Sequence, residues 1–488
     1  MSYRDLNRDL KLLFWAIFLW SFGQGLYNFL WPNYVLELGA SPVTLGSLFS
    51  FAFFIATLSS LPGGYLADHF DRRGVMIAGW LVALPAPVLY GLARDWRWLV
   101  PGILLFFLSF FCNSATQAYV AGAAQRERLT GVYNLVFSSF PLGMVLSPAL
   151  GGYLAETWGM RLVFFLATGF MIASTVLLFL LTPQRSFSTG PEAADEEGFR
   201  KTKRKPGAKN AQIDQDAAET RAFRIGGRWL KGTLLGGWEL LIGGHEVRKP
   251  GSEQVRIWPK TPGADRLGRS FMRRWIVLFV GDPGLWHRLL PAMSFFGLLV
   301  GILTLVSSFS SPFLQEVAGL DKVWIGLLGS VNALGSGLIS PPFGHLADRI
   351  GKRRAMPLGM LAYGVTLLAF VFWPGSLFLL FLNFFLRGSG DALRGIMNST
   401  VGETAPPEQA GRAFALFNLT TGVGAMVFPY LGGVLYSRAP AYPFQLMAVL
   451  LLIGAGFLWY QSKLTWFRGR APSRGRREGD KGKPEGSG

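Results

Sequence analysis

The chain has 488 residues, half of them hydrophobic and only 16% charged, and 41 of them are phenylalanine. Many apolar runs approach the roughly 20 residues that a helix needs to cross a bilayer core, which excludes a set of ordinary soluble domains. The net charge of +18 is spread over alternate loops, a middle segment and the C-terminus. That distribution is typical of basic cytoplasmic loops and argues against a nucleic-acid-binding domain.

Six apolar runs in the first part of the chain predict six membrane-spanning helices. They cover residues 11–31, 44–66, 74–93, 98–120, 132–155 and 161–182. Arg4, Arg8 and Lys11 precede the first run and predict a cytoplasmic N-terminus. The first run has no small-residue cleavage site and is followed by another span, so we expect it to remain as an anchor.

Two of these spans carry polar residues that are candidates for a solute site. They are Gln24 and Asn28, with Asn33 close by, in the first span, and Asn113 and Gln117 in the fourth. Lipid cannot satisfy polar groups, so these side chains should face the interior of the bundle. A lining of a cavity and hydrogen bonding between helices remain equally good interpretations for the first span.

The fifth span contains a run of small residues around a proline. Its members are Gly143, Ser147, Pro148, Gly151 and Gly152. Small residues let helix backbones touch, and the proline bends the helix. A similar pattern ending in Gly432 and Gly433 occupies the eleventh span. Helix packing is therefore the predicted role of both patterns.

The segment 183–287 differs in composition from the spans on either side. Up to about Arg221 it is rich in Lys, Arg, Glu, Pro and Gly, which predicts a disordered cytoplasmic linker. Residues 222–280 contain paired glycines among aromatic and aliphatic residues, and Arg273–Val280 is basic and aromatic enough to lie on the inner leaflet. A poorly ordered connector is the favoured interpretation of this second part.

Six further spans are predicted at 288–312, 323–343, 355–374, 377–400, 413–436 and 441–463. The tenth contains Arg387, Asp391 and Arg394, whose spacing places them on one helix face. Charges within a span are candidates for a site: Asp391 for a proton, Arg387 for an anionic group. A self-neutralising cluster with a structural or gating role is favoured, because two arginines keep the aspartate ionised. The tail, 464–488, is predicted to be a disordered basic arm near anionic lipid.

The second set of spans repeats the first. Loops Gly64–Arg73 and Gly344–Arg354 each join two spans and are related by an offset of 280 residues, which also relates Gly46 to Gly326. An offset of 281 relates Gly152 to Gly433. Such internal duplication of membrane helices is typical of secondary transporters.

The second loop resembles the signature loop of the major facilitator superfamily at every defined position. The first loop resembles it with His69 and Asp71 in place of the usual Arg and Gly. The resemblance implies an all-α membrane protein of twelve transmembrane helices in two pseudo-symmetric six-helix bundles, residues 1–182 and 288–463, around a central cavity. The small-residue run of the fifth span is similar to the antiporter motif of part of this superfamily, the drug:proton antiporter-like group, with Ser147 in place of a glycine. Its recurrence in the eleventh span weakens that resemblance.

The resemblance also implies that the two loops act as gates. Asp68 would meet the start of helix eleven and Asp348 the start of helix five, where a carboxylate stabilises a positive helix N-terminus. The gating residues so implied are Gly64, Asp68, Arg72, Arg73, Gly344, Asp348, Arg349, Gly351, Lys352 and Arg353. Orientation of the chain in the membrane is the alternative role of the basic ones.

No set of residues indicates an enzyme, a cofactor or a metal site. Cys112 is the only cysteine, no acid-rich pair of histidines suggests a metal site, and no nucleotide-binding loop occurs. The favoured hypothesis is a monomeric transporter in the cytoplasmic membrane, with both termini inside, that exports a small organic solute in exchange for protons. No acidic residue lies deep in the first six spans, so proton coupling is supported less strongly than transport.

Two alternatives remain open. One is uptake of a sugar, carboxylate or peptide by symport or uniport, with Arg387 binding an anionic group. The other is a membrane scaffold or sensor that engages a partner through residues 222–280.

Overall fold

The computed structural model describes residues 3–124, 129–184, 245–248, 254–257, 283–404 and 410–469. The chain forms two compact units, one of residues 1–187 and 282–488 and the other of residues 188–281. Within the second unit, β1 (His245–Arg248) and β2 (Gln254–Ile257) pair as an antiparallel hairpin. Most of the predicted linker, including nearly all of 222–280, and the tail beyond Gly469 lie outside the described residues.

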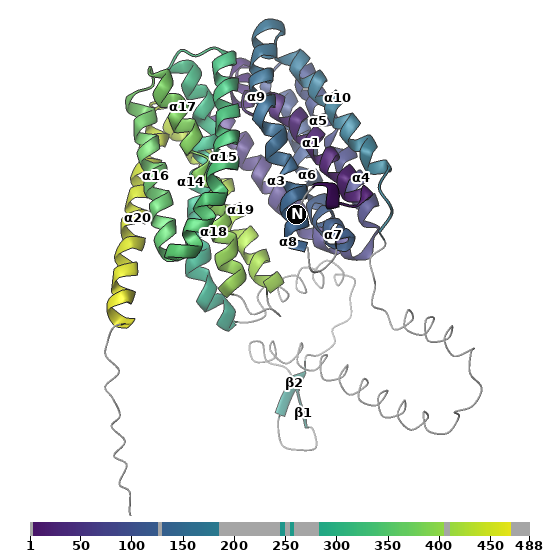
Figure 1. The fold of residues 1–488 in the computed structure, drawn as a ribbon, viewed down its shortest axis with the longest axis vertical. Coiled ribbons are helices and arrows are strands. Elements are labelled where there is room, and N and C mark those ends of the chain that lie inside the picture. The colour runs from purple at the N-terminus through teal and green to yellow at the C-terminus, as the bar shows by residue number, and fades with distance from the viewer. Residues whose placement is uncertain are drawn as a thin grey trace, which may run out of the picture. The chain divides into compact units, whose positions relative to one another are not determined.

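The first unit is a bundle of α-helices (Figure 1). Its N-terminal half consists of η1 (Tyr3–Asp5), α1 (Arg8–Asn28), α2 (Trp31–Glu37), α3 (Pro42–His69), α4 (Arg72–Ala83), α5 (Pro85–Leu92), η2 (Trp96–Trp98), α6 (Leu99–Leu108), η3 (Ser109–Phe111), α7 (Cys112–Ala123), α8 (Leu129–Phe137), α9 (Ser139–Trp158) and α10 (Met160–Phe179). The first predicted span thus ends at Asn28, and a short separate helix with Pro32 in its first turn follows it.

The C-terminal half has the same plan with fewer interruptions. It consists of α14 (Pro283–Glu316), α15 (Lys322–Ile350), α16 (Lys352–Phe372), α17 (Leu377–Leu386), α18 (Ser389–Thr404), α19 (Ala410–Tyr436) and α20 (Tyr442–Gly469). The seventh span begins at Pro283 and the twelfth continues to Gly469, so both are longer than predicted.

Matching N-caps begin the second membrane span of each half, α3 and α15. Ser41 accepts a hydrogen bond from the backbone N–H of Thr44 at 3.1 Å at the start of α3. Asp321, its equivalent at the offset of 280, accepts one from Trp324 at 2.9 Å at the start of α15. Each side chain satisfies an N–H that the first helical turn leaves without a partner. The duplication seen in the sequence therefore extends to how these helices start.

Eleven helical segments in the described part of the chain are long and apolar enough to cross a membrane. The predicted tenth span is the exception, because it is divided into α17 and α18 and carries Arg387, Asp391 and Arg394. At the break, Gly388 lies against the backbone of α15 at Gly335, where a Cβ atom would lie 2.2 Å from the nearest atoms. The predicted all-α membrane architecture is confirmed, with a break in its most polar span.

The two halves meet along two pairs of helices, α9 with α15 and α3 with α19. The offset of about 280 residues converts one pair into the other, since α3 corresponds to α15 and α9 to α19. Core side chains such as Phe313, Phe370 and Phe384 fill the C-terminal half, and Tyr27, Tyr90 and Phe164 fill the N-terminal half. These two packed halves position the loops and the polar residues of the spans.

Candidate functional site: a cavity between two helical halves

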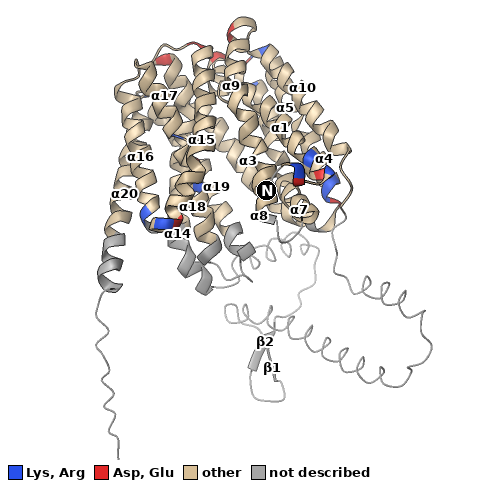
Figure 2. Cartoon of the chain, viewed as in Figure 1, with Lys and Arg blue, Asp and Glu red and all other residues tan. Residues whose placement is uncertain are grey.

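The bundle has two ends that differ in how tightly the halves are joined. At the loop end lie the two signature loops, α3–α4 and α15–α16, and the start of α1 (Figure 2). The Asn7 amide donates to the carbonyl of Ala123 at 3.0 Å, which joins the N-terminal segment to the end of α7. The backbone N–H of Arg72 donates to the carbonyl of Gln184 at 3.1 Å, which joins the first loop to the residues that follow α10. The opposite end, here the Lys322 end, contains α2, the end of α9 and the start of α15.

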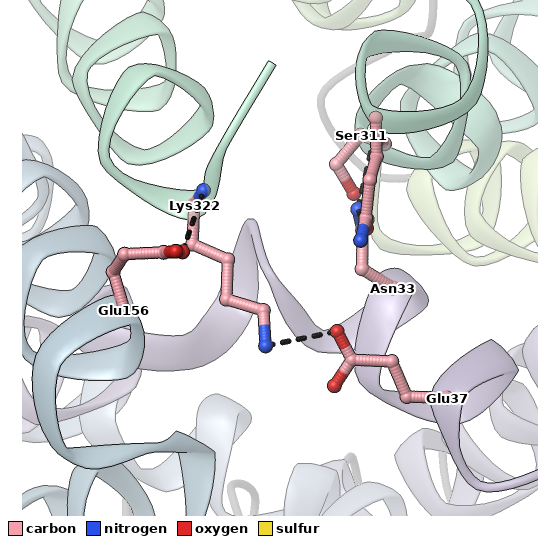
Figure 3. Close-up of polar contacts among 6 residues, drawn as sticks. Asn33, Glu37, Glu156, Ser311 and Lys322 are labelled. Atoms are coloured by element: carbon pink, nitrogen blue, oxygen red, sulfur yellow. Dashed lines mark hydrogen bonds and ion pairs between the residues drawn. The ribbon is translucent and has the colours of Figure 1, made fainter. Parts of the chain in front are cut away.

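Polar contacts join the two halves at the Lys322 end (Figure 3). Lys322 of α15 forms an ion pair with Glu37 of α2 at 2.9 Å, and its backbone N–H donates to Glu156 of α9 at 3.2 Å. The buried Asn33 amide donates to the carbonyl of Ser311 at 3.2 Å and to the side chain of Gln315, both in α14. Asn33 is therefore used in bonding between helices, one of the two interpretations left open for the first span.

Two further hydrogen bonds cross between the halves at equivalent positions. The backbone N–H of Ala149 donates to Ser330 Oγ at 2.9 Å, and that of Tyr430 donates to Ser50 Oγ at 3.1 Å. Each donor directly follows the proline inside its helix, in α9 and α19. A proline disturbs the helical bonds around it, and a neighbouring serine can satisfy the backbone group that is freed.

Glycines bring the same helix pairs into backbone contact. A Cβ atom on Gly152 would lie 2.3 Å from the carbonyl oxygen of Lys322, and one on Gly326 equally close to that of Pro148. In the equivalent pair, a Cβ on Gly46 would lie 2.2 Å from the carbonyl of Pro429. The halves can approach this closely only because these positions lack side chains.

The remaining small residues of the fifth span face the first span. A Cβ on Gly143 would lie 2.0 Å from Ser21 Oγ, and one on Gly151 would lie 1.8 Å from the carbonyl of Leu26. Ser147 is fully buried against Gly25 and donates to the carbonyl of Gly143 at 2.8 Å. The small-residue run thus packs α9 against α1 on one face and α15 on another.

At the loop end, the residues that the structure describes form no polar contact between the halves like those at the Lys322 end. Asp348 is exposed and forms no hydrogen bond or ion pair with any described residue, and a Cβ on Gly64 or Gly344 would meet nothing within 4 Å. Pro342, His345, Leu346 and Arg349 line a cavity of about 540 Å³ on α15 there. The side chains of Asp68 and Arg353, and those at the first residues of α8 and α19, lie outside the described residues.

The basic residues of the first loop bind within their own half. Arg72 donates from Nη1 to the carbonyl of Ala118 at 3.0 Å, and Arg73 donates from Nε to that of Leu178 at 3.3 Å. Asp71 accepts a hydrogen bond from Gly74 at 2.9 Å and is the N-cap of α4. The carboxylate at the place of the usual glycine is therefore used to start a helix.

A second cavity, of about 230 Å³, lies at the break in the tenth span. It is lined by Phe29, Leu303, Ser307, Asn332, Tyr363, Phe384, Arg387, Gly390, Asp391 and Arg394. Phe29 comes from the N-terminal half and the others from the C-terminal half. The three charged residues of the tenth span therefore share one cavity, which we call the Arg387 cavity.

The other polar candidates lie elsewhere. Gln24 is half-buried and Asn28 is exposed on α1, and Asn113 and Gln117 are exposed on α7. None of the four lines the Arg387 cavity. Sequence reasoning missed Asn332, Tyr363 and the aromatic pair Phe29 and Phe384. Only their proximity to Arg387 in the folded chain distinguishes them from other residues of the spans.

Comparison with known proteins decides the family. The Major Facilitator Superfamily profile matches residues 13–324 and 293–486. The chain belongs to this superfamily. It is a multi-pass membrane transporter and not an enzyme, as the signature loops predicted. The transporter family and the twelve-helix, two-bundle plan are thereby confirmed.

Relatives of this superfamily member include multidrug transporters. It is 21% identical to Multidrug resistance protein 2 of Bacillus subtilis over 460 residues, which cover 92% of this chain and 94% of that protein. It is 32% identical to the multi-drug resistance efflux pump PmrA of Streptococcus pneumoniae over 33% of this chain and 40% of the pump. An uncharacterised transporter of Methanocaldococcus jannaschii is 21% identical over 39% of this chain and 50% of its own length. The matches to most such relatives thus span half of their length or less.

Solved structures share the fold of this transporter. A POT family transporter bound to a thioalcohol-conjugated peptide superposes with a TM-score of 0.66 at 15% identity, covering 94% of this chain and 96% of that one. The nucleoside transporter NupG superposes with a TM-score of 0.61 at 12% identity, covering 94% and 99%. At these identities the likeness concerns the fold alone.

Proposed function

We propose that this transporter exports a small amphipathic organic solute across the cytoplasmic membrane by alternating access, as a monomer and in exchange for protons. One observation carries the proposal: a cavity lined by Phe29 and by nine residues of the C-terminal half lies in a bundle whose described polar contacts between the halves gather toward the Lys322 end. Alternating access requires such an arrangement, in which rocking of the halves opens one end and closes the other. The multidrug relatives support export as the direction.

The proposed gates are the two ends already described. The Lys322 end is held by an ion pair, by Asn33 and by the two serine bonds, all of which must break for that end to open. The loop end would close by bringing Asp348 to the start of helix five and Asp68 to the start of helix eleven. The open space around Gly64 and Gly344 leaves room for that approach. Because basic loops stay on the cytoplasmic side, the loop end and both termini would face the cytoplasm.

Asp391 is the proposed site of proton coupling. It lies exposed in the Arg387 cavity and forms no ion pair with the part of the chain that the structure describes. Arg387 and Arg394 line the same cavity, so mutual neutralisation of the three charges stays a prediction. A carboxylate that both ends can reach in turn is able to carry a proton across as the halves rock.

The same residue favours one alternative, uptake of an anion together with a proton. The lining contains two arginines and one aspartate. Protonation of Asp391 would remove the only negative charge and strengthen the binding of an anion, so that proton and anion would load together. Export in exchange for protons needs the two to bind in alternation.

Flux in vesicles separates these possibilities. The full chain, reconstituted with a pH-sensitive dye trapped inside, is exposed to a panel of amphipathic solutes added outside. Exchange predicts that solute entry makes the lumen alkaline, whereas co-transport predicts that it becomes acidic. Asp391→Asn should abolish the pH signal, while Asp95→Asn, in the α5–α6 loop away from the cavity, should preserve it. Absence of flux for every solute, with folded protein, would contradict transport.

A further inference from the structure

Arg387 is buried in the membrane-spanning part of the bundle, without an acidic partner among the residues that the structure describes. Its side chain is 7% exposed. Nη2 donates to Ser310 Oγ at 2.7 Å, whereas Nη1 has no hydrogen-bond acceptor among the described residues. Asp391, one turn along in sequence, forms no ion pair with it. Burying a guanidinium in this way is costly unless a negative group completes its hydrogen bonds.

The surroundings hold this guanidinium in one place. Its central carbon lies 4.7 Å from the ring centre of Phe384 and 5.8 Å from that of Phe370, so two aromatic rings flank the charge. The hydrogen bond to Ser310 holds one edge of the guanidinium. Gly388, the next residue, packs against the backbone of α15 and so holds the main chain from which the Arg387 side chain projects. A positioned guanidinium with a free edge is suited to a planar anion such as a carboxylate.

The lining of the Arg387 cavity combines aromatic and aliphatic side chains with charged and polar ones. Phe29, Leu303 and Phe384 contribute apolar surface, while Arg394 adds a second exposed positive charge. With Asp391 ionised, the lining carries one net positive charge. A bound monoanion would neutralise this charge, whereas two arginines would repel an organic cation.

From this geometry we propose that the Arg387 cavity binds an organic monocarboxylate with an apolar, preferably aromatic, body. The carboxylate would accept from Arg387 Nη1, and the apolar body would lie against Phe29 and Phe384. This inference rests on the proposed transport function, since it names the solute class of the same cavity. It holds for either direction of transport, and an anionic solute favours co-transport with a proton over exchange.

The test is binding by the purified full chain in lipid nanodiscs, measured by calorimetry without any gradient. The probes are N-acetylphenylalanine, its neutral amide, and cationic phenylalaninamide, which share the aromatic body and differ in charge. We expect the carboxylate to bind more tightly than both amides. Arg387→Gln should weaken its binding by at least about tenfold, the usual size of a lost hydrogen bond to a charged group, and Arg387→Lys should weaken it less. Arg438→Gln, which removes an exposed arginine remote from the cavity, should leave it unchanged.

Several results would overturn the inference. The first is that either amide binds as tightly as the acid or more tightly. The second is that the acid does not bind at millimolar concentration, and the third is that Arg387→Gln leaves the affinity for the acid unchanged. If Arg387→Gln does not fold, Arg394→Gln takes its place, because that side chain is exposed in the cavity, and a several-fold weakening is expected there. Binding of the acid without flux in vesicles would contradict transport alone, whereas flux of the neutral amide would contradict the solute class alone.

Discussion

Asp71 and Gly351 hold equivalent places in the two signature loops, yet they form the turn in different ways. Gly351 has φ = +84° and ψ = +140°, a conformation that side chains disfavour strongly. Asp71 has φ = −57° and caps α4 with its carboxylate. The first copy could lose the glycine because its backbone no longer needs positive φ. This is the physical reason for the departure noticed in the sequence.

Substitutions at these positions should separate backbone strain from side-chain contact. Gly351→Ala should destabilise the protein by about 1–3 kcal/mol through backbone strain, and Asp71→Ala by about 1 kcal/mol through loss of the cap. Gly64→Ala and Gly344→Ala are the controls, since a Cβ there meets open space and a helical backbone accepts alanine. Thermal unfolding in detergent measures all four. A Gly351→Ala protein as stable as its Gly344→Ala counterpart would contradict the assigned strain.

Residue patterns predicted part of the site. Charges within an apolar span identified Arg387, Asp391 and Arg394, and the structure places all three in one cavity. Their spacing predicted that they share a helix face, but the sequence does not give the direction of their side chains or the break at Gly388. Gln24, Asn28, Asn113 and Gln117 were chosen for polarity alone, which does not specify the side of a helix that faces the cavity.

Two equivalent pairs of helices, α9–α15 and α3–α19, hold the two halves together. The sequence predicted the duplicated helices and the role of glycines in close packing. It did not predict that Ser50 and Ser330 accept from the backbone beyond each proline, although the two serines are related by the same offset of 280. The serines and the prolines lie on different helices, so their pairing depends on the packing of the two halves.

Removal of both serine hydroxyls should favour opening at the Lys322 end. Each hydrogen bond contributes about 1 kcal/mol, so Ser50→Ala with Ser330→Ala should shift the equilibrium by roughly 30-fold. A reporter cysteine at Ser311, which is buried there, introduced into a Cys112→Ala background, measures opening by its rate of labelling with an impermeant maleimide. A cysteine at the exposed Ser437 is the control. An unchanged labelling rate at position 311 would show that the two bonds do not hold this end closed.

At the scale of the whole molecule, duplication explains both the fold and the gates. The offset that relates the signature loops also relates the N-caps Ser41 and Asp321 and the contact glycines Gly46 and Gly326. Two equivalent interfaces join the halves toward the Lys322 end, and the described residues at the loop end form none as close. A conformation that is closed at one end and open at the other has this arrangement. The sequence predicted the two-bundle plan, but which end is joined depends on contacts between halves that no local pattern encodes.

A reversible disulfide across the Lys322 end tests alternating access most directly. In the Cys112→Ala background, Ala149→Cys with Ser330→Cys should form one, because a hydrogen bond of 2.9 Å joins the backbone of one residue to the side chain of the other. The account predicts that oxidation stops flux of a panel solute through reconstituted protein and that reduction restores it, while each single cysteine variant transports in both conditions. Full flux through the cross-linked protein would contradict the claim that this end must open.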